Sequence, residues 1–184
     1  MKILVVVDMQ NDFITGSLGT KESQIIVPNV KKKVEEYMRN NEPIVFTRDT
    51  HFENYSVTKE GKKLPVDHCV KNTPGWEICD ELEKAVRGYH SATILDKYTF
   101  GCNRLPAYIF DNYVGHLNIT EPVEIELVGL CTDICVVSNA MLLKTYFYNN
   151  ADISVDANCC AGVTPETHEA ALKTMEMCQI NVKR

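Results

Sequence analysis

The sequence lacks the segments that would place the protein in a membrane or in a secretory pathway. No apolar run among its 184 residues approaches the roughly 20 residues that a membrane-spanning helix needs. No signal peptide is apparent, because Met1 and Lys2 lead straight into a strand-like run at residues 3–7. A formal net charge of −6 disfavours nucleic acids and anionic membranes as main partners. We therefore expect a cytoplasmic protein.

The eight cysteines form no C-x-x-C pair, which argues against a structural zinc knuckle. In a cytoplasmic protein we expect their thiols to be reduced rather than joined in disulfides. The chain also has no internal repeat, no low-complexity segment and no change of composition that would mark a linker. These absences favour one domain over residues 1–184, a length that can bury a substantial core.

Apolar runs that are typical of strands alternate with segments of helical period along the whole chain. Residues 3–7 are a continuous apolar run rich in β-branched residues, as expected for a strand covered on both faces of a parallel sheet. The other strands are expected at residues 43–47, 92–95, 123–128, 153–155 and 180–182. Helices are expected at residues 25–38, 76–86, 105–113 and 165–177, and residues 131–148 are expected to form a turn and then a helix. The alternation predicts a three-layer α/β fold, with one doubly wound parallel sheet and helices on both faces.

Cys135 follows a predicted buried strand and falls in the first turn of the helix after it. The positive end of a helix favours the thiolate, so this position predicts a lowered pKa and a nucleophilic sulfur. The alternative interpretation is a small buried apolar side chain, which is the commoner role of a free cysteine. The residues at the neighbouring strand ends favour the nucleophile.

Three further predicted strands end in side chains that can carry out chemistry. Asp8 follows the first strand, Asp49 and His51 follow the second, and Lys97 follows the third. The carboxyl ends of parallel strands meet at one edge of a sheet, so we expect these side chains beside Cys135. Asp8 can accept the thiol proton and return it to a leaving amine, while Lys97 can stabilise the thiolate. The set predicts acyl transfer from a small amide through a thioester, with no redox cofactor.

Asp49 and His51 also form a D-x-H pair with metal-ligand character, and His68 lies further on in a long loop. Residues 52–75 show no clear period, and a loop of this length in a compact domain is commonly functional. Imidazole and carboxylate ligands suit zinc, iron or manganese. On spacing alone, three unrelated polar residues remain the simpler interpretation.

Five stretches of the chain resemble the isochorismatase-like superfamily of cysteine hydrolases, and within it the nicotinamidase/pyrazinamidase branch. They occur in order at residues 7–13, 47–51, 68–75, 96–100 and 129–136. The resemblance implies a six-stranded parallel sheet flanked by helices and a catalytic triad of Asp8, Lys97 and Cys135. It also implies a cis peptide bond between Leu130 and Cys131, and an oxyanion hole formed by the backbone N–H groups of Cys131 and Cys135.

The nicotinamidase branch further implies a divalent metal that takes the pyridine nitrogen of the substrate, and no organic cofactor. We expect zinc, with iron or manganese as alternatives. The matching ligand positions are Asp49, His51 and His68, and Glu60 in the same loop is a further candidate. Phe13 matches an aromatic residue that packs on the substrate ring. Relatives are often homo-oligomers, and we expect a homo-oligomer here.

The loop before His68 departs from the nicotinamidase pattern. Relatives commonly carry a tryptophan just before the histidine segment, whereas here that segment begins with Leu64 and Trp76 comes after the loop. Without that tryptophan, the candidates for the substrate-pocket wall are Tyr98, Phe100 and Leu130.

Three functions are therefore compatible with the sequence. The first is a metal-containing nicotinamidase, and the second is a metal-poor hydrolase of another small amide, ureido or carbamoyl compound. The third is a non-catalytic binding protein, which is disfavoured because Asp8, Lys97 and Cys135 are all present. Metal content and ammonia release from nicotinamide distinguish the first two functions.

Overall fold

The computed structural model describes residues 1–115 and 122–184, and these residues contain one six-stranded parallel sheet. The strand order is β3-β2-β1-β4-β5-β6, and every neighbouring pair is parallel. The strands are β1 (Lys2–Val7), β2 (Ile44–Asp49), β3 (Ala92–Lys97), β4 (Val123–Leu130), β5 (Ala151–Ala161) and β6 (Asn181–Lys183). The predicted doubly wound α/β fold is confirmed.

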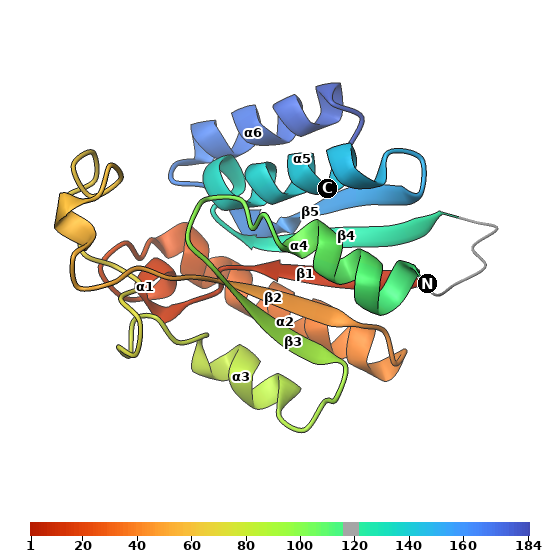
Figure 1. Cartoon of the computed structure of the whole chain (residues 1–184), viewed down its shortest axis with the longest axis horizontal. Helices are drawn as coiled ribbons and strands as arrows, with labels where there is room; N and C mark the ends of the chain where they lie inside the picture. The colour runs from red at the N-terminus through yellow and green to blue at the C-terminus, as the bar shows by residue number, and fades with distance from the viewer. Residues whose placement is uncertain (116–121) are drawn as a thin grey trace.

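Helices cover both faces of the sheet and complete the three layers (Figure 1). One face carries α2 (Lys21–Arg39), α3 (Asp80–Val86) and the short α1 (Asn11–Ile14). The other face carries α4 (Leu105–Ile109), α5 (Val137–Phe147) and α6 (Pro165–Met177). None of the helices in the described residues is long and apolar enough to cross a membrane.

The central strand β1 shows why the sheet is buried on both sides. Ile3 and Val5 pack into the apolar cluster under α4, α5 and α6. Leu4 and Val6 alternate with them and pack into the cluster under α2 and α3. Side chains in a strand point to opposite faces in turn, so a continuous apolar run suits a strand with helices on both sides.

The structure corrects three of the predicted boundaries. The predicted helix over residues 76–86 begins only at Asp80, because the carbonyl of Trp76 accepts a hydrogen bond from Gln10 in the loop before it. The helix expected over residues 105–113 is α4 followed by a wider helical turn at Phe110–Val114. Strand β5 continues to Ala161, well beyond the predicted residue 155, because its end pairs with the end of β4.

Candidate active site

Four neighbouring strands deliver polar side chains to one edge of the sheet. Asp49 and Lys97 are register partners and the last residues of β2 and β3. Asp8 directly follows β1, and Cys135 lies in the turn that follows β4. The strand order therefore brings together four side chains that lie far apart in the sequence.

The Lys97 ammonium lies at the centre of this group. Its Nζ atom is 2.7 Å from Oδ2 of Asp8, 2.9 Å from Oδ1 of Asp49 and 3.5 Å from Sγ of Cys135. Burial opposes the charged form, but Asp8, Cys135 and Asp49 together raise the pKa of Lys97 well above its ordinary value. The lysine is therefore a fixed positive charge between two carboxylates and a thiol.

Asp8 is fully buried, and its two carboxylate oxygens have different partners. Oδ1 accepts a hydrogen bond from the Thr47 hydroxyl at 2.7 Å. Oδ2 forms the ion pair with Lys97 but accepts no well-directed hydrogen bond from the described residues, because the lysine N–H groups donate to Asp49, Thr99 and Cys135. Burial raises the pKa of Asp8, against the effect of Lys97. Oδ2 is therefore available to accept a proton.

The prediction of a lowered pKa for Cys135 is wrong. Burial raises the pKa of its thiol well above the ordinary value, the charge of Asp8 raises it further, and Lys97 opposes both. The field at a helix end contributes only about 0.3–1 kcal/mol at an exposed site. Cys135 is only 5% exposed, so the cost of burying a charged thiolate outweighs the effect of that field on the pKa. A thiol whose pKa is raised must give up its proton when the sulfur reacts.

The turn between β4 and Cys135 has an unusual backbone. The peptide bond between Leu130 and Cys131 is cis, and Gly129 has a φ of 117°. A Cβ atom on Gly129 would lie 2.1 Å from the carbonyl oxygen of Val7, so only glycine fits beside β1. The Asn139 side chain accepts from the N–H of Cys102 and donates to the carbonyl of Cys135, which holds the turn in place.

Asp49, His51 and His68 form a cluster that could hold a metal ion, with one ligand atom from each lying within 4.8 Å of the others. Nε2 of His51 is 3.0 Å from Oδ2 of Asp49, and Nε2 of His68 is 3.8 Å from the same oxygen. Oε1 of Glu60 lies 3.8 Å from His51 and 3.9 Å from His68, so Glu60 also faces the cluster. Burial acts to raise the pKa of Asp49, but the hydrogen bond from His51 and the charge of Lys97 lower this pKa to about 2.

The surroundings of the cluster direct its ligand atoms inward. Nδ1 of His68 lies 2.8 Å from the carbonyl of Val66, which fixes the ring and leaves Nε2 toward the cluster. The buried Tyr55 ring packs against both imidazoles, at 4.6 Å from His51 and 5.0 Å from His68. Two imidazoles and one or two carboxylates are a donor set that suits zinc, and also iron or manganese. The residues present therefore fit a divalent metal.

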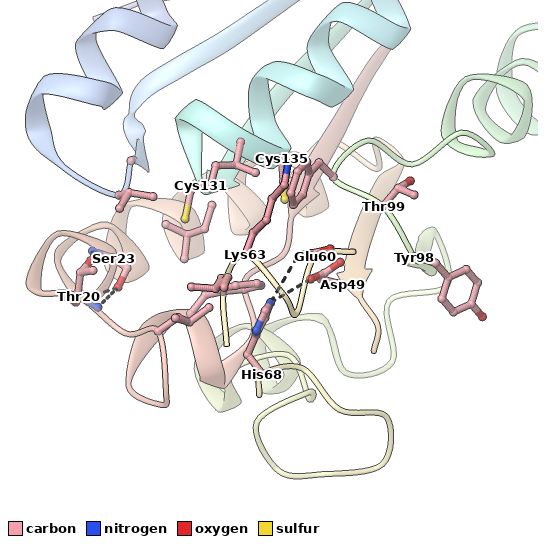
Figure 2. Close-up of a pocket in the computed structure, with 18 of the residues that line it drawn as sticks. Thr20, Ser23, Asp49, Glu60, Lys63, His68, Tyr98, Thr99, Cys131 and Cys135 are labelled. Atoms are coloured by element: carbon pink, nitrogen blue, oxygen red, sulfur yellow. Dashed lines mark hydrogen bonds and ion pairs between the residues drawn. The ribbon is translucent and has the colours of Figure 1, made fainter. Parts of the chain in front are cut away.

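A cavity of about 840 Å³ opens beside the Cys135 thiol and the candidate metal ligands Asp49 and His68. All four predicted pocket residues line it: Phe13, Tyr98, Phe100 and Leu130. Phe13 packs 5.6 Å from the His68 ring, whereas Tyr98 is 56% exposed and stacks on Phe52 at 5.9 Å. Figure 2 shows Tyr98 directed away from the centre of the cavity, so Tyr98 belongs to the rim.

Sequence reasoning missed Gln10 as part of the site. Its Nε2 atom donates to the carbonyl oxygens of Asp49 and Trp76, and its Oε1 atom accepts from the N–H of Asp49 at 2.6 Å. Trp76 lies outside the cavity, where Arg48 stacks 3.4 Å from its ring centre and its indole donates to Thr50. The only signal in the sequence was the place of Gln10 two residues after Asp8.

The chain is similar to known proteins in sequence, and to a solved structure in fold. The Saccharomyces cerevisiae nicotinamidase is 30% identical over 175 residues, covering 77% of this chain and 80% of the yeast protein. A probable inactive nicotinamidase of Arabidopsis thaliana is 29% identical over 193 residues, covering 98% of this chain and 89% of the relative. The crystal structure of the Pyrococcus horikoshii pyrazinamidase in complex with zinc superposes with a TM-score of 0.80 at 27% identity, covering 100% of this chain and 98% of the other.

The family model for the isochorismatase domain matches residues 2–183, which is nearly the whole chain. The similarity also extends over most of the length of each relative, at 80% of the yeast protein, 89% of the Arabidopsis protein and 98% of the Pyrococcus structure. The chain is therefore a hydrolase of the isochorismatase family.

Proposed function

We propose that the protein hydrolyses small amides through a covalent thioester, and that its substrate is nicotinamide. The observation that carries this proposal is the position of Lys97, which lies 2.7 Å from Asp8 and 3.5 Å from Cys135 in a buried site. A nucleophile, a proton acceptor and a fixed positive charge are the groups that acyl transfer needs. The similarity to a yeast nicotinamidase supports the choice of substrate.

In the first half of the reaction, Cys135 attacks the amide carbonyl carbon while its proton passes to Asp8. The carbon–sulfur bond forms, and the electron pair of the carbonyl moves to oxygen, where the N–H groups of Cys131 and Cys135 stabilise it. When this intermediate collapses, the carbon–nitrogen bond breaks and Asp8 returns the proton to the leaving nitrogen as ammonia forms. Lys97 stabilises the sulfur anion while the thiol proton is on Asp8.

In the second half, water attacks the thioester carbonyl while Asp8 accepts a proton from it. Collapse of this second intermediate breaks the carbon–sulfur bond, and the proton on Asp8 returns to the Cys135 sulfur. The products are a carboxylic acid and the free enzyme. Because burial raises the pKa of Asp8, the carboxyl group takes up a proton more readily than an ordinary aspartate would.

Asp49, His51 and His68 would hold a divalent metal, with Glu60 as a fourth side chain. Such an ion supplies a Lewis acid that binds a lone pair of the substrate and so fixes its orientation. The side chains themselves orient the amide, because Phe13 beside His68 and Leu130 beside the cis turn line the cavity between the cluster and the thiol. The carbonyl carbon then lies toward Cys135.

Ammonia release from nicotinamide tests this function. We expect purified protein to release ammonia and nicotinate in equal amounts, with loss of activity in a chelator and recovery on adding zinc, iron or manganese. Cys135→Ala protein serves as the matched control, since only the sulfur is removed. Absence of ammonia from nicotinamide in metal-loaded protein would contradict the choice of substrate.

The size of the cavity favours one second candidate. A volume of about 840 Å³ lies in the range of pockets that take drug-sized ligands. Hydrolysis of a larger amide, ureido or carbamoyl compound by the same residues is therefore the alternative to nicotinamide hydrolysis.

A further inference from the structure

We propose that the mouth of the cavity binds an anion, and that the protein also hydrolyses primary amides with a carboxylate at the far end of the molecule. This inference rests on the proposed amide hydrolysis and adds a second substrate class to it. The binding groups are Lys59, Lys62 and Lys63, which line the cavity together with the Cys135 wall.

The three lysines carry positive charge that no nearby carboxylate balances. None of them lies within 4.0 Å of a carboxylate in the described part of the chain, whereas Lys33 and Lys97 each contact two. The two carboxylates that line the cavity are Asp49 and Glu60, and both face the metal-ligand cluster. The cavity lining therefore carries three unpaired lysines beside two carboxylates that are directed at the cluster, and this excess of positive charge favours an anion.

The backbone of this loop is fixed close to the cavity by its own hydrogen bonds. The Thr58 hydroxyl donates to the carbonyl of Tyr55 and accepts from the N–H of Gly61, and the Tyr55 hydroxyl donates to the carbonyl of Leu64. A Cβ atom on Gly61 would lie 2.1 Å from the Tyr55 carbonyl oxygen, so glycine allows this close packing. Tyr55 in turn packs on the candidate metal ligand His51.

Lys63 lines the same cavity as Cys131 and Cys135 and adds a positive charge to it. Figure 2 shows Lys63 among the side chains that line the cavity, with Glu60, Cys131 and Cys135. Apolar side chains, among them Leu18, Leu64 and Val163, line the same cavity. An amide bound at Cys135 can therefore extend a hydrocarbon chain along apolar walls and end in a carboxylate beside the lysines.

Two substrates that differ only in charge test this inference. Adipamate has a primary amide and a carboxylate at opposite ends, and its methyl ester has the same chain without the charge. We expect kcat/KM to be about tenfold higher for adipamate, a preference that weakens as the salt concentration rises. In the variant Lys59→Gln, Lys62→Gln, Lys63→Gln the two substrates should become equal within about twofold.

Matched variants separate a charge effect from a folding effect. The triple lysine-to-arginine variant keeps the charges and should keep the preference for adipamate. The variant Lys173→Gln removes a lysine on α6, outside the cavity lining, and should also keep the preference. Equal rates for the two substrates in the unmodified protein would overturn the inference, as would a preference that survives the triple glutamine variant. Ammonia from nicotinamide without any preference for adipamate would leave the proposed function standing and reject this inference alone. Ammonia from adipamate and none from nicotinamide would support this inference and reject nicotinamide as the substrate.

Discussion

The Lys97 ammonium lies 2.9 Å from Oδ1 of Asp49, while Oδ2 of the same carboxylate lies 3.0 Å from Nε2 of His51. A single side chain therefore joins the group around the thiol to the candidate metal ligands. Asp49 is buried and contacts both Lys97 and His51, so its carboxylate belongs to both parts of the site. A change at Asp49 should therefore affect both metal binding and the reactivity of Cys135.

The Asp49→Asn variant tests this bridge. We expect at least a tenfold loss of zinc affinity, by about 1.4 kcal/mol or more, because an anionic ligand becomes neutral. We also expect faster alkylation of Cys135 by iodoacetamide near pH 8, because the Asp49 charge helps to raise the pKa of the thiol. His68→Ala is the control and should weaken zinc binding without changing the alkylation rate. Alkylation at the normal rate in Asp49→Asn protein would show that the two parts are independent.

Replacing each of the two cysteines of the turn by alanine should have very different effects on activity. Cys135→Ala removes the proposed nucleophile and should lower kcat on the order of 10⁴-fold or more. Cys131→Ala keeps the backbone N–H that is assigned to the oxyanion, so kcat should change by no more than about fivefold. Steady-state ammonia release measures both. Similar losses in the two variants would contradict the assignment of Cys135.

The pH dependence of thiol alkylation tests the electrostatics of the site. In the unmodified protein the alkylation rate should rise only at pH values above the ordinary thiol range of about 8.5, because burial and Asp8 raise the pKa of Cys135. Asp8→Asn removes a negative charge beside the sulfur, so the same rise should occur at lower pH although turnover is lost. Lys97→Met removes the stabilising cation and should move the rise to higher pH. A rise at neutral pH in the unmodified protein would support a thiolate at rest instead.

Gln10 should be needed for stability and for the geometry of Asp49. Gln10→Ala leaves the N–H of Asp49 and the carbonyls of Asp49 and Trp76 without their buried partner. We expect a loss of roughly 1–3 kcal/mol in the free energy of unfolding, measured by urea denaturation, with weaker zinc binding. Asn11→Ala is the control, because its side chain donates to the Pro74 carbonyl at an exposed site and should cost less than about 1 kcal/mol. Equal losses in the free energy of unfolding for the two variants would show that Gln10 has no special role in holding the site.

The fold was predictable because its main signal is local in the sequence. The run from Ile3 to Val7 has no polar residue to face solvent, and it proved to be a central strand with helices on both sides. The end of β5 was not predictable in the same way. Cys160 and Ala161 are strand residues only because Gly129 and Leu130 lie beside them, and such pairing does not show in one segment of sequence.

The candidate site was also predictable only in part. Asp8, Asp49 and Lys97 could be placed together because strand ends share an edge of the sheet. The pKa of Cys135 could not be predicted, since it depends on how deeply the thiol is buried and on two carboxylates from other strands. The arrangement of residues 55–64 was equally hidden, because it rests on contacts of Gly61 and Thr58 with Tyr55 rather than on any periodicity.

Peptide mass spectrometry of acid-quenched enzyme during nicotinamide turnover tests the central claim most directly. The account predicts one nicotinoyl group on the peptide that contains Cys135, attached as a thioester that hydroxylamine removes. The Cys131→Ala variant should carry the same adduct, and the Cys135→Ala variant should carry none. Undiminished ammonia release by Cys135→Ala protein, or an acyl group on a different residue, would contradict the account.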